Sequence, residues 1–205
     1  MNFRLPVWAF WSIKAWKENK DRCGEIFDGL LGWDITDFGK NDFYRYGLLL
    51  FTIRNGNIKK NKKPYAEKIM IAEVGQETPM HFHWHKMEDI INRGGGDLVI
   101  EPYNSTKDEG LSKEPVILKI DGIESTFNPG EKIILKPGES ISLEQGIYHR
   151  FYAEKEKVLM GEVSMVNDDN SDNRFYQPVG RFPEIEEDEK PLHLLVNDYQ
   201  KILGV

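Results

Sequence analysis

Short β-rich runs separated by turn residues fill the chain between Tyr46 and Val166, and they constrain its fold more than any other feature. Apolar and β-branched residues dominate the runs 47–53, 65–74, 97–103, 115–120 and 158–166. Turn residues stand between the runs, at Asn55-Gly56, 94–96, Asp121-Gly122, Pro129-Gly130 and Pro137-Gly138. No helical periodicity interrupts this region, so the pattern predicts an all-β sandwich or small barrel.

Helices are predicted only near the two ends of the chain. Ser12 can cap a first helix, and a second runs through residues 25–31 and ends at Gly32. The acidic stretch 183–191 precedes a short closing helix at 193–203. A chain of 205 residues fits one domain. We expect a helical or irregular segment at 1–45, a barrel at 46–180, and an acidic segment with a short helix at 181–205.

Charge and cysteine content narrow the function classes. The net charge of −7 argues against nucleic acid as a partner, because such partners favour a basic face. Cys23 is the single cysteine of the sequence, which excludes an intramolecular disulfide and suits a reducing compartment. No apolar stretch approaches membrane-spanning length, so we expect no membrane partner and a cytoplasmic location.

The stretch MHFHWHKMEDI at 80–90 holds three of the five histidines of the chain. In a strand, alternate residues share a face, so His81 and His83 would point at one metal ion, and His85 has the same parity. Glu88 can fold back to add a carboxylate, and His149, on a later β-rich run, is the candidate for a remote ligand. The alternative is a solvent-facing strand rich in histidine and tryptophan that binds no metal.

Three imidazoles and one carboxylate suit Mn, Fe, Co, Ni or Zn better than Mg or Ca. Such a set leaves positions in an octahedral shell for water or substrate. That openness favours a catalytic site over a structural zinc site.

The spacing of these residues resembles the cupin motifs. Gly75-x5-His81-x-His83-x4-Glu88-x6-Gly95 is similar to the first motif, position for position. Gly138-x5-Glu144-x-Gly146-x2-His149 resembles the second, although the family usually has proline at Glu144 and asparagine at Ala153. The resemblance implies a double-stranded β-helix (jelly-roll) barrel with the metal inside it.

Longer segments resemble one cupin family, the D-lyxose isomerases. They are GWDITDFG (32–39), LFTIRNG (50–56), YAEKIM (65–70), TPMHFHWHKMEDIINRGGG (78–96), PGES (137–140) and GEVSMVNDD (161–169). The resemblance implies a Mn-dependent aldose–ketose isomerase that interconverts D-lyxose and D-xylulose, and with less preference D-mannose and D-fructose. It implies His81, His83, Glu88 and His149 as metal ligands, does not favour His85, and is compatible with Zn, Co or Fe. Cupins commonly pair through their sheets, so we expect a homodimer.

Aldose–ketose isomerisation needs a base beside the metal. If the charged segment 153–157 is a hairpin turn, His149 faces Glu162 across two strands and Glu162 points into the barrel. We therefore expect Glu162 to be the catalytic base; the alternative is an exposed strand glutamate. Lys86, between the ligands, is a second catalytic candidate, or else an exposed loop lysine.

Sugar-binding candidates lie near the ligands or follow the last predicted strand. Asp172 and Arg174 could bind hydroxyls at the barrel mouth, unless they belong to a polar turn. Trp84 and Phe175 could pack on the apolar face of the sugar, although Trp84 could instead be a core residue. Of Glu67 and Lys68, on opposite faces of one strand, at most one can face the site.

Three rival functions share these ligands. A sugar-phosphate isomerase would need a cluster of basic residues for the phosphate, which is not evident in the sequence. A dioxygenase would use similar ligands with iron and oxygen. A non-catalytic sugar-binding cupin would keep the fold without the reaction.

Overall fold

The computed structural model describes residues 3–57, 60, 62–166, 171–180 and 188–205. Its strands are β1 Gly32–Thr36, β2 Leu48–Arg54, β3 Tyr65–Ala72, β4 Glu77–Phe82, β5 Glu88–Asn104, β6 Val116–Ile120, β7 Ile123–Phe127, β8 Ile133–Leu135, β9 Ser140–Leu143, β10 Ile147–Met165 and β11 Arg174–Phe175. Its helical segments are η1 Val7–Phe10, α1 Ile13–Asn19, η2 Lys20–Arg22, α2 Gly24–Asp28 and η3 Tyr199–Leu203. Strands therefore dominate, and the all-β prediction is confirmed.

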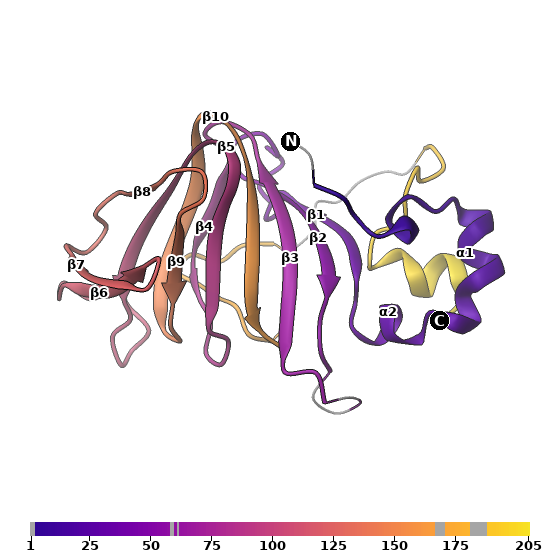
Figure 1. The fold of residues 1–205 in the computed structure, drawn as a ribbon, viewed down its shortest axis with the longest axis horizontal. Helices are drawn as coiled ribbons and strands as arrows, with labels where there is room; N and C mark the ends of the chain where they lie inside the picture. The colour runs from indigo at the N-terminus through magenta and orange to yellow at the C-terminus, as the bar shows by residue number, and fades with distance from the viewer. Residues whose placement is uncertain (1–2, 58–59, 61, 167–170, 181–187) are drawn as a thin grey trace.

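All paired strands of the main sheet run antiparallel, in the order β1-β2-β3-β10-β5-β9-β6-β7. Beside this path, β4 pairs with β10 and β11, and β8 pairs with β5. Figure 1 shows the strands curving around a common interior, with the helices gathered at one end beside β1 and β2. Buried apolar side chains of β2, β3, β5, β6, β8, β9 and β10 form the core inside this curved sheet.

The two longest strands, β5 and β10, pair along almost their whole length, and this corrects two sequence predictions. Residues 153–157 form no hairpin turn, and residues 94–96 form no turn between strands. Instead the register shifts between Glu154 and Val158, opposite the three glycines. A Cβ atom on Gly96 would collide with the backbone oxygen of Glu154, so glycine lets the two strands approach closely where they bend.

The N-terminal helices follow the predicted positions, but α2 ends earlier, and the closing helix predicted at 193–203 is shorter, since η3 spans only Tyr199–Leu203. Most of the acidic stretch predicted at 183–191 lies outside the described residues. Ser12 caps α1, with its Oγ accepting a hydrogen bond from the backbone N–H of Ala15. Helix α2 ends before Gly29, whereas the predicted end was Gly32. Gly32 has a φ of +133° and begins β1, a strand of the main sheet that contributes side chains to the barrel interior.

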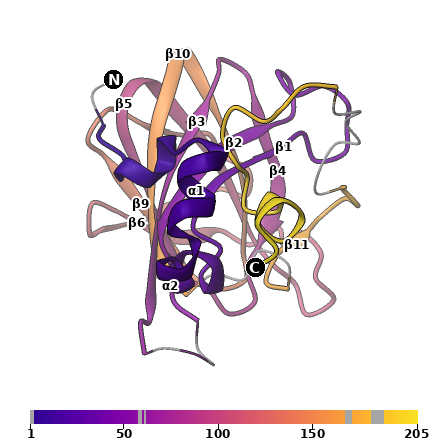
Figure 2. The same cartoon turned by 90° about the vertical axis from the view of Figure 1, so that its right-hand side faces the viewer.

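The N-terminal and C-terminal segments pack on each other in a second apolar cluster. Trp16, Cys23 and Tyr199 are buried there, and Trp8 packs against it and against Phe51 of β2, at a ring-centroid distance of 4.9 Å. Figure 2 shows α1 and α2 beside the C-terminal turn, in front of the sheet. The N-terminal tryptophans are thus packed within this chain. None of the described helices is long and apolar enough to cross a membrane.

Candidate metal centre

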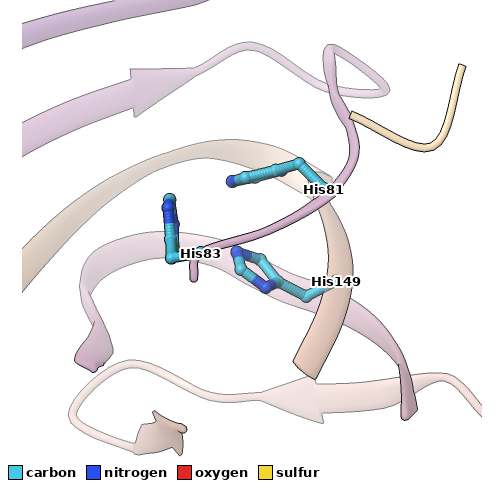
Figure 3. Close-up of side chains that lie close together, drawn as sticks. All are labelled: His81, His83 and His149. Carbon is cyan, nitrogen blue, oxygen red and sulfur yellow. The ribbon is translucent and has the colours of Figure 1, made fainter. Parts of the chain in front are cut away.

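Three histidines converge in the barrel, two from the neighbouring strands β4 and β10 and one from just past the end of β4. His149 of β10 lies directly opposite His81 of β4, with their ring centroids 4.3 Å apart, and His83 follows the end of β4. One nitrogen from each ring lies within 4.8 Å of the others, and all three residues are buried (Figure 3). Strand pairing therefore joins His149 to two residues more than sixty positions earlier.

Backbone carbonyls assign the same tautomer to all three rings. The Nδ1 atoms lie 2.7 Å from the oxygen of Pro79 for His81, 2.9 Å from that of Asp172 for His83, and 3.0 Å from that of Ile147 for His149. A carbonyl only accepts, so Nδ1 carries the proton of each neutral ring. Each Nε2 then offers a lone pair, the arrangement typical of metal-binding histidines.

Glu88, the first residue of β5, completes the group. Its Oε1 lies 3.3 Å from Nε2 of His83 and 3.2 Å from Nε2 of His149. Among the described residues these three atoms are buried without a hydrogen-bond partner. Buried lone pairs that face one another repel, and a cation between them removes that cost. The donor set of three imidazole nitrogens and one carboxylate oxygen fits a divalent transition metal.

The ionisation of the site also suits a cation. Burial lowers the pKa of His81 well below its ordinary value, and the neighbouring His149 and His83 lower it further. Burial acts to raise the pKa of Glu88, but the Lys86 ammonium and His83 hold it well below its usual range. A neutral imidazole and an ionised carboxylate are the forms that coordinate metals.

A cavity of about 290 Å³ opens beside these side chains. Its lining includes His81, His83, Glu88, Lys86, Glu162 and Phe175 among the residues predicted from sequence. Apolar side chains of β2, β3 and β10 form much of the remaining wall, namely Leu48, Leu50, Met70 and Phe151. The volume is at the small end of the range for ligand pockets, so it suits a small molecule.

Glu162 points into this cavity, although the hairpin from which we predicted its direction does not exist. It lies in β10 between Lys68 of β3 and Ile90 of β5. Its Oε1 lies 3.0 Å from Nζ of Lys86, 3.4 Å from Nζ of Lys68, and accepts a hydrogen bond of 3.0 Å from Oγ of Ser164. The side chain is buried, which rules out the exposed alternative.

Lys86 is buried as well, although it lies in the connection between β4 and β5. Its Nζ lies 2.7 Å from Oε2 of Glu88, so it contacts the carboxylates of both Glu88 and Glu162. Lys68 resolves the choice left open for β3: it faces the cavity, whereas Glu67 pairs with Arg54 on the other side. Lys68 lies on the same face of β3 as the buried Ala66 and Met70. The alternation of these positions in the sequence could have indicated that Lys68 faces inward.

The other predicted residues are divided between the cavity and its surroundings. Phe175 lines the cavity, with its ring centroid 5.3 Å from that of His81. Trp84 and Arg174 both donate to the Glu109 carboxylate, and neither belongs to the cavity lining. Trp84 is 40% exposed, so it is not a core residue.

Asp172 lies outside the cavity lining too, and its buried carboxylate accepts hydrogen bonds from the backbone N–H groups of His85 and Lys86. The side chain of His85 is exposed, and His85 is not in the three-histidine group.

Sequence reasoning missed the part of the cavity wall formed by β1. Asp34 and Thr36 line the cavity, while Trp33 of the same strand points away and donates to the backbone oxygen of Ala9. The usual rule that apolar residues face the interior fails here because the N-terminal segment covers the other face of β1. Asn173 is a further polar lining residue that no sequence pattern indicated.

Two known proteins are similar in sequence to this chain over nearly its whole length. A D-lyxose/D-mannose isomerase of Serratia proteamaculans is 49% identical over 205 residues, covering 98% of this chain and 90% of the relative. A D-lyxose/D-mannose isomerase of Escherichia coli O157:H7 is 47% identical over 202 residues, covering 96% of this chain and 89% of the relative.

Solved structures support the fold class. The crystal structure of Geodermatophilus obscurus L-ribose isomerase superposes with a TM-score of 0.54 at 12% identity, covering 90% of this chain and all of that one. This likeness supports the predicted cupin-type barrel. The model of the family described as D-lyxose isomerase matches residues 1–199, nearly the whole sequence. This chain therefore belongs to the D-lyxose isomerase family.

Proposed function

We propose that this chain is a metal-dependent aldose–ketose isomerase that interconverts D-lyxose with D-xylulose, and D-mannose with D-fructose. The names of its two relatives at 49% and 47% identity support the sugar substrates. The observation that carries the proposal is the set of buried, unpartnered Nε2 and Oε1 atoms of His83, His149 and Glu88, next to a cavity into which Glu162 points.

His81, His83, Glu88 and His149 would hold the metal. When bound, a divalent metal supplies a Lewis acid that polarises the carbonyl and neighbouring hydroxyl of the sugar. Glu162 is a buried carboxylate that lines the cavity, with its Oε1 held by Lys86, Lys68 and Ser164. It is therefore the group proposed to accept a proton from C2 of the aldose and return it to C1 of the enediolate.

Lys86 and Lys68 have complementary roles in this proposal. Both ammonium groups lie near Glu162 in a buried setting, so they stabilise negative charge as it develops on the sugar oxygens. Lys86 also contacts Glu88, which places a proton donor next to the metal ligands. Phe175, beside His81, would pack against the carbon skeleton of the sugar.

Four finer properties belong to this proposal. Mn²⁺ is the proposed metal. A set of three nitrogens and one oxygen with open positions suits it, and the same set suits Zn, Co or Fe. A homodimer is supported by the exposed neighbours Tyr65 and Met165 on the outer face of β3 and β10. A cytoplasmic location fits the single cysteine. Residues 1–45 and 181–205 belong with the barrel as a single domain.

A sugar panel assayed with Mn²⁺, Co²⁺, Fe²⁺ and Zn²⁺ tests the function. The expected result is formation of D-xylulose from D-lyxose and D-fructose from D-mannose by the metal-loaded protein, and none after chelation. Turnover of phosphorylated sugars alone, or oxygen uptake with iron, would replace the proposal with one of its rivals. Sugar binding without any ketose would indicate a non-catalytic cupin.

A further inference from the structure

Asp172 contacts the connection between β4 and β5 in three places. Its two carboxylate oxygens accept separate hydrogen bonds of 2.9 Å, from the backbone N–H of His85 and from that of Lys86. Its main-chain oxygen lies 2.9 Å from Nδ1 of His83. The residue is only 5% exposed. One residue thus binds both ends of the segment that carries a candidate metal ligand and a candidate proton donor.

This connection depends on such contacts because it lies outside the strand ladders. Strand β4 ends at Phe82 and β5 begins at Glu88. On one side, the backbone N–H of Gly146 donates to the oxygen of His83, and the Gln145 side chain donates to that of His85. Asp172 is the contact on the other side. Among the described contacts, the main chain of residues 83–86 would without it be held from the Gln145–Gly146 turn, and Met87 by its bond from the backbone N–H of Met165.

The contacts of Asp172 also argue against a direct role in sugar binding. Both carboxylate oxygens already accept backbone N–H groups, and the residue is not part of the cavity lining. Charge-assisted hydrogen bonds to backbone amides are among the stronger ones. They are suited to fixing a loop in one conformation.

We propose that Asp172 is a positioning residue: its carboxylate fixes the β4–β5 connection and thereby the orientation of the His83 ring and the reach of Lys86 to Glu88 and Glu162. This inference rests on the proposed function, because it assigns Asp172 to the same metal centre. The partner of the second ring nitrogen of His83 is the main-chain oxygen of Asp172, and the carboxylate holds that oxygen and the connection together. Disturbing such a partner changes metal affinity or activity about 10–100-fold.

The variants Asp172→Asn and Asp172→Ala test this role. An asparagine would turn its NH₂ group toward one of the two backbone N–H groups, so one hydrogen bond is lost without a change of size. We expect Co²⁺ affinity, measured by titration of the apoprotein, to fall about tenfold in Asp172→Asn and up to about 100-fold in Asp172→Ala. The visible absorption bands of bound Co²⁺ should also change, while KM for the sugar stays close to that of the parent.

Asp121→Asn is the matched control. Asp121 also uses its carboxylate to accept a backbone N–H, from Ser140, but in an exposed turn away from the metal centre. It should retain the parent's Co²⁺ affinity and spectrum. If Asp172→Ala does not fold, Asp172→Asn carries the test alone.

The outcomes separate the proposal from its alternatives. Unchanged Co²⁺ affinity and spectrum with a raised KM would overturn the positioning role in favour of sugar binding. Unchanged values of all three would show that the carboxylate has no role at the site. The Co²⁺ readout does not depend on isomerisation, so failure of the proposed sugar reaction would be seen separately.

Discussion

The Nζ of Lys86 lies 3.0 Å from Oε1 of Glu162, deep in the barrel. The same ammonium lies 2.7 Å from Oε2 of Glu88. A single buried cation therefore joins the carboxylate that faces the histidines to the carboxylate proposed as the base. In the proposed mechanism this contact links metal binding to proton transfer, and substitutions of Glu162 and of Lys86 should separate the two.

Glu162→Gln should remove isomerisation and leave metal binding intact. The amide keeps the shape of the side chain but cannot take a proton from carbon, so kcat should fall about 10²–10⁴-fold. Bound metal, measured by elemental analysis, should equal that of the parent. The control is Glu156→Gln, an exposed glutamate of the same strand, which should keep full activity. Parent-like turnover of D-lyxose by Glu162→Gln would show that another group is the base.

Lys86→Met should destabilise the metal-free protein strongly. It leaves the buried Glu88 and Glu162 carboxylates without the ammonium between them, and removing one partner of a buried ion pair costs about 3–5 kcal/mol. Urea unfolding of the apoprotein measures this loss.

Added Mn²⁺ should recover part of that stability, because the metal would neutralise Glu88. Lys155→Met is the control, since the Lys155 side chain is exposed and its partner Asp97 keeps a second ion pair with Lys136, so the stability should change little. Equal losses in the two variants would contradict a special role for Lys86.

The sequence spacing predicted which side chains lie together better than it predicted the strand pairing around them. His81, His83 and Glu88 lie close in the sequence, so a strand and a short return suffice to bring them together. His149 was predicted as a histidine on a later β-rich run and from the resemblance to the second cupin motif. Its place opposite His81 depends on the pairing of β10 with β4, which no local pattern encodes.

The part of the cavity around Glu162 was harder to predict, also because it depends on strand pairing. The charged segment 153–157 looks like a turn locally, yet β10 continues through it because β5 pairs with both of its halves. Glu162 faces inward through that pairing and not through a hairpin. Asp34 was missed because the partner that covers the outer face of β1 comes from the N-terminal segment, and only tertiary packing places it there.

Variants of His149 and His85 compare a buried, proposed metal ligand with an exposed histidine. His149→Ala should lose bound metal, because Nε2 of His149 faces Oε1 of Glu88 and has no other described partner. His85→Ala should keep the metal, because His85 is exposed. Elemental analysis of both variants measures the difference. Metal retention by His149→Ala, or loss by His85→Ala, would refute the proposed ligand set.

Removal of the metal should lower thermal stability. A ligand that binds only the folded state at a hundred times its Kd stabilises by about 2.7 kcal/mol. For a chain of this size that corresponds to a fall in Tm of about 5–10 °C on chelation. Scanning calorimetry before and after addition of a chelator measures it, and returning Mn²⁺ should restore the Tm. His149→Ala should show no response to either treatment.

The contact between Gly39 and Gly180 should matter for the shape of the cavity. Gly180 lines the cavity, and a Cβ atom on Gly39 would lie 2.8 Å from Cα of Gly180. Gly39→Ala should therefore displace that wall and raise KM for the sugar, as well as lower the Tm.

Gly75→Ala separates the contact from the backbone cost. Gly39 and Gly75 have φ angles of +71° and +74°, so alanine should cost both about 1–2 kcal/mol, but a Cβ on Gly75 would meet nothing within 4 Å. Gly39→Ala should lose more stability than Gly75→Ala, and only Gly39→Ala should change KM. If both variants have the same Tm and KM, the close approach of the two glycines does not shape the cavity. A larger loss of stability and a raised KM in Gly39→Ala would show that the cavity wall at Gly180 needs a residue without a Cβ atom at position 39.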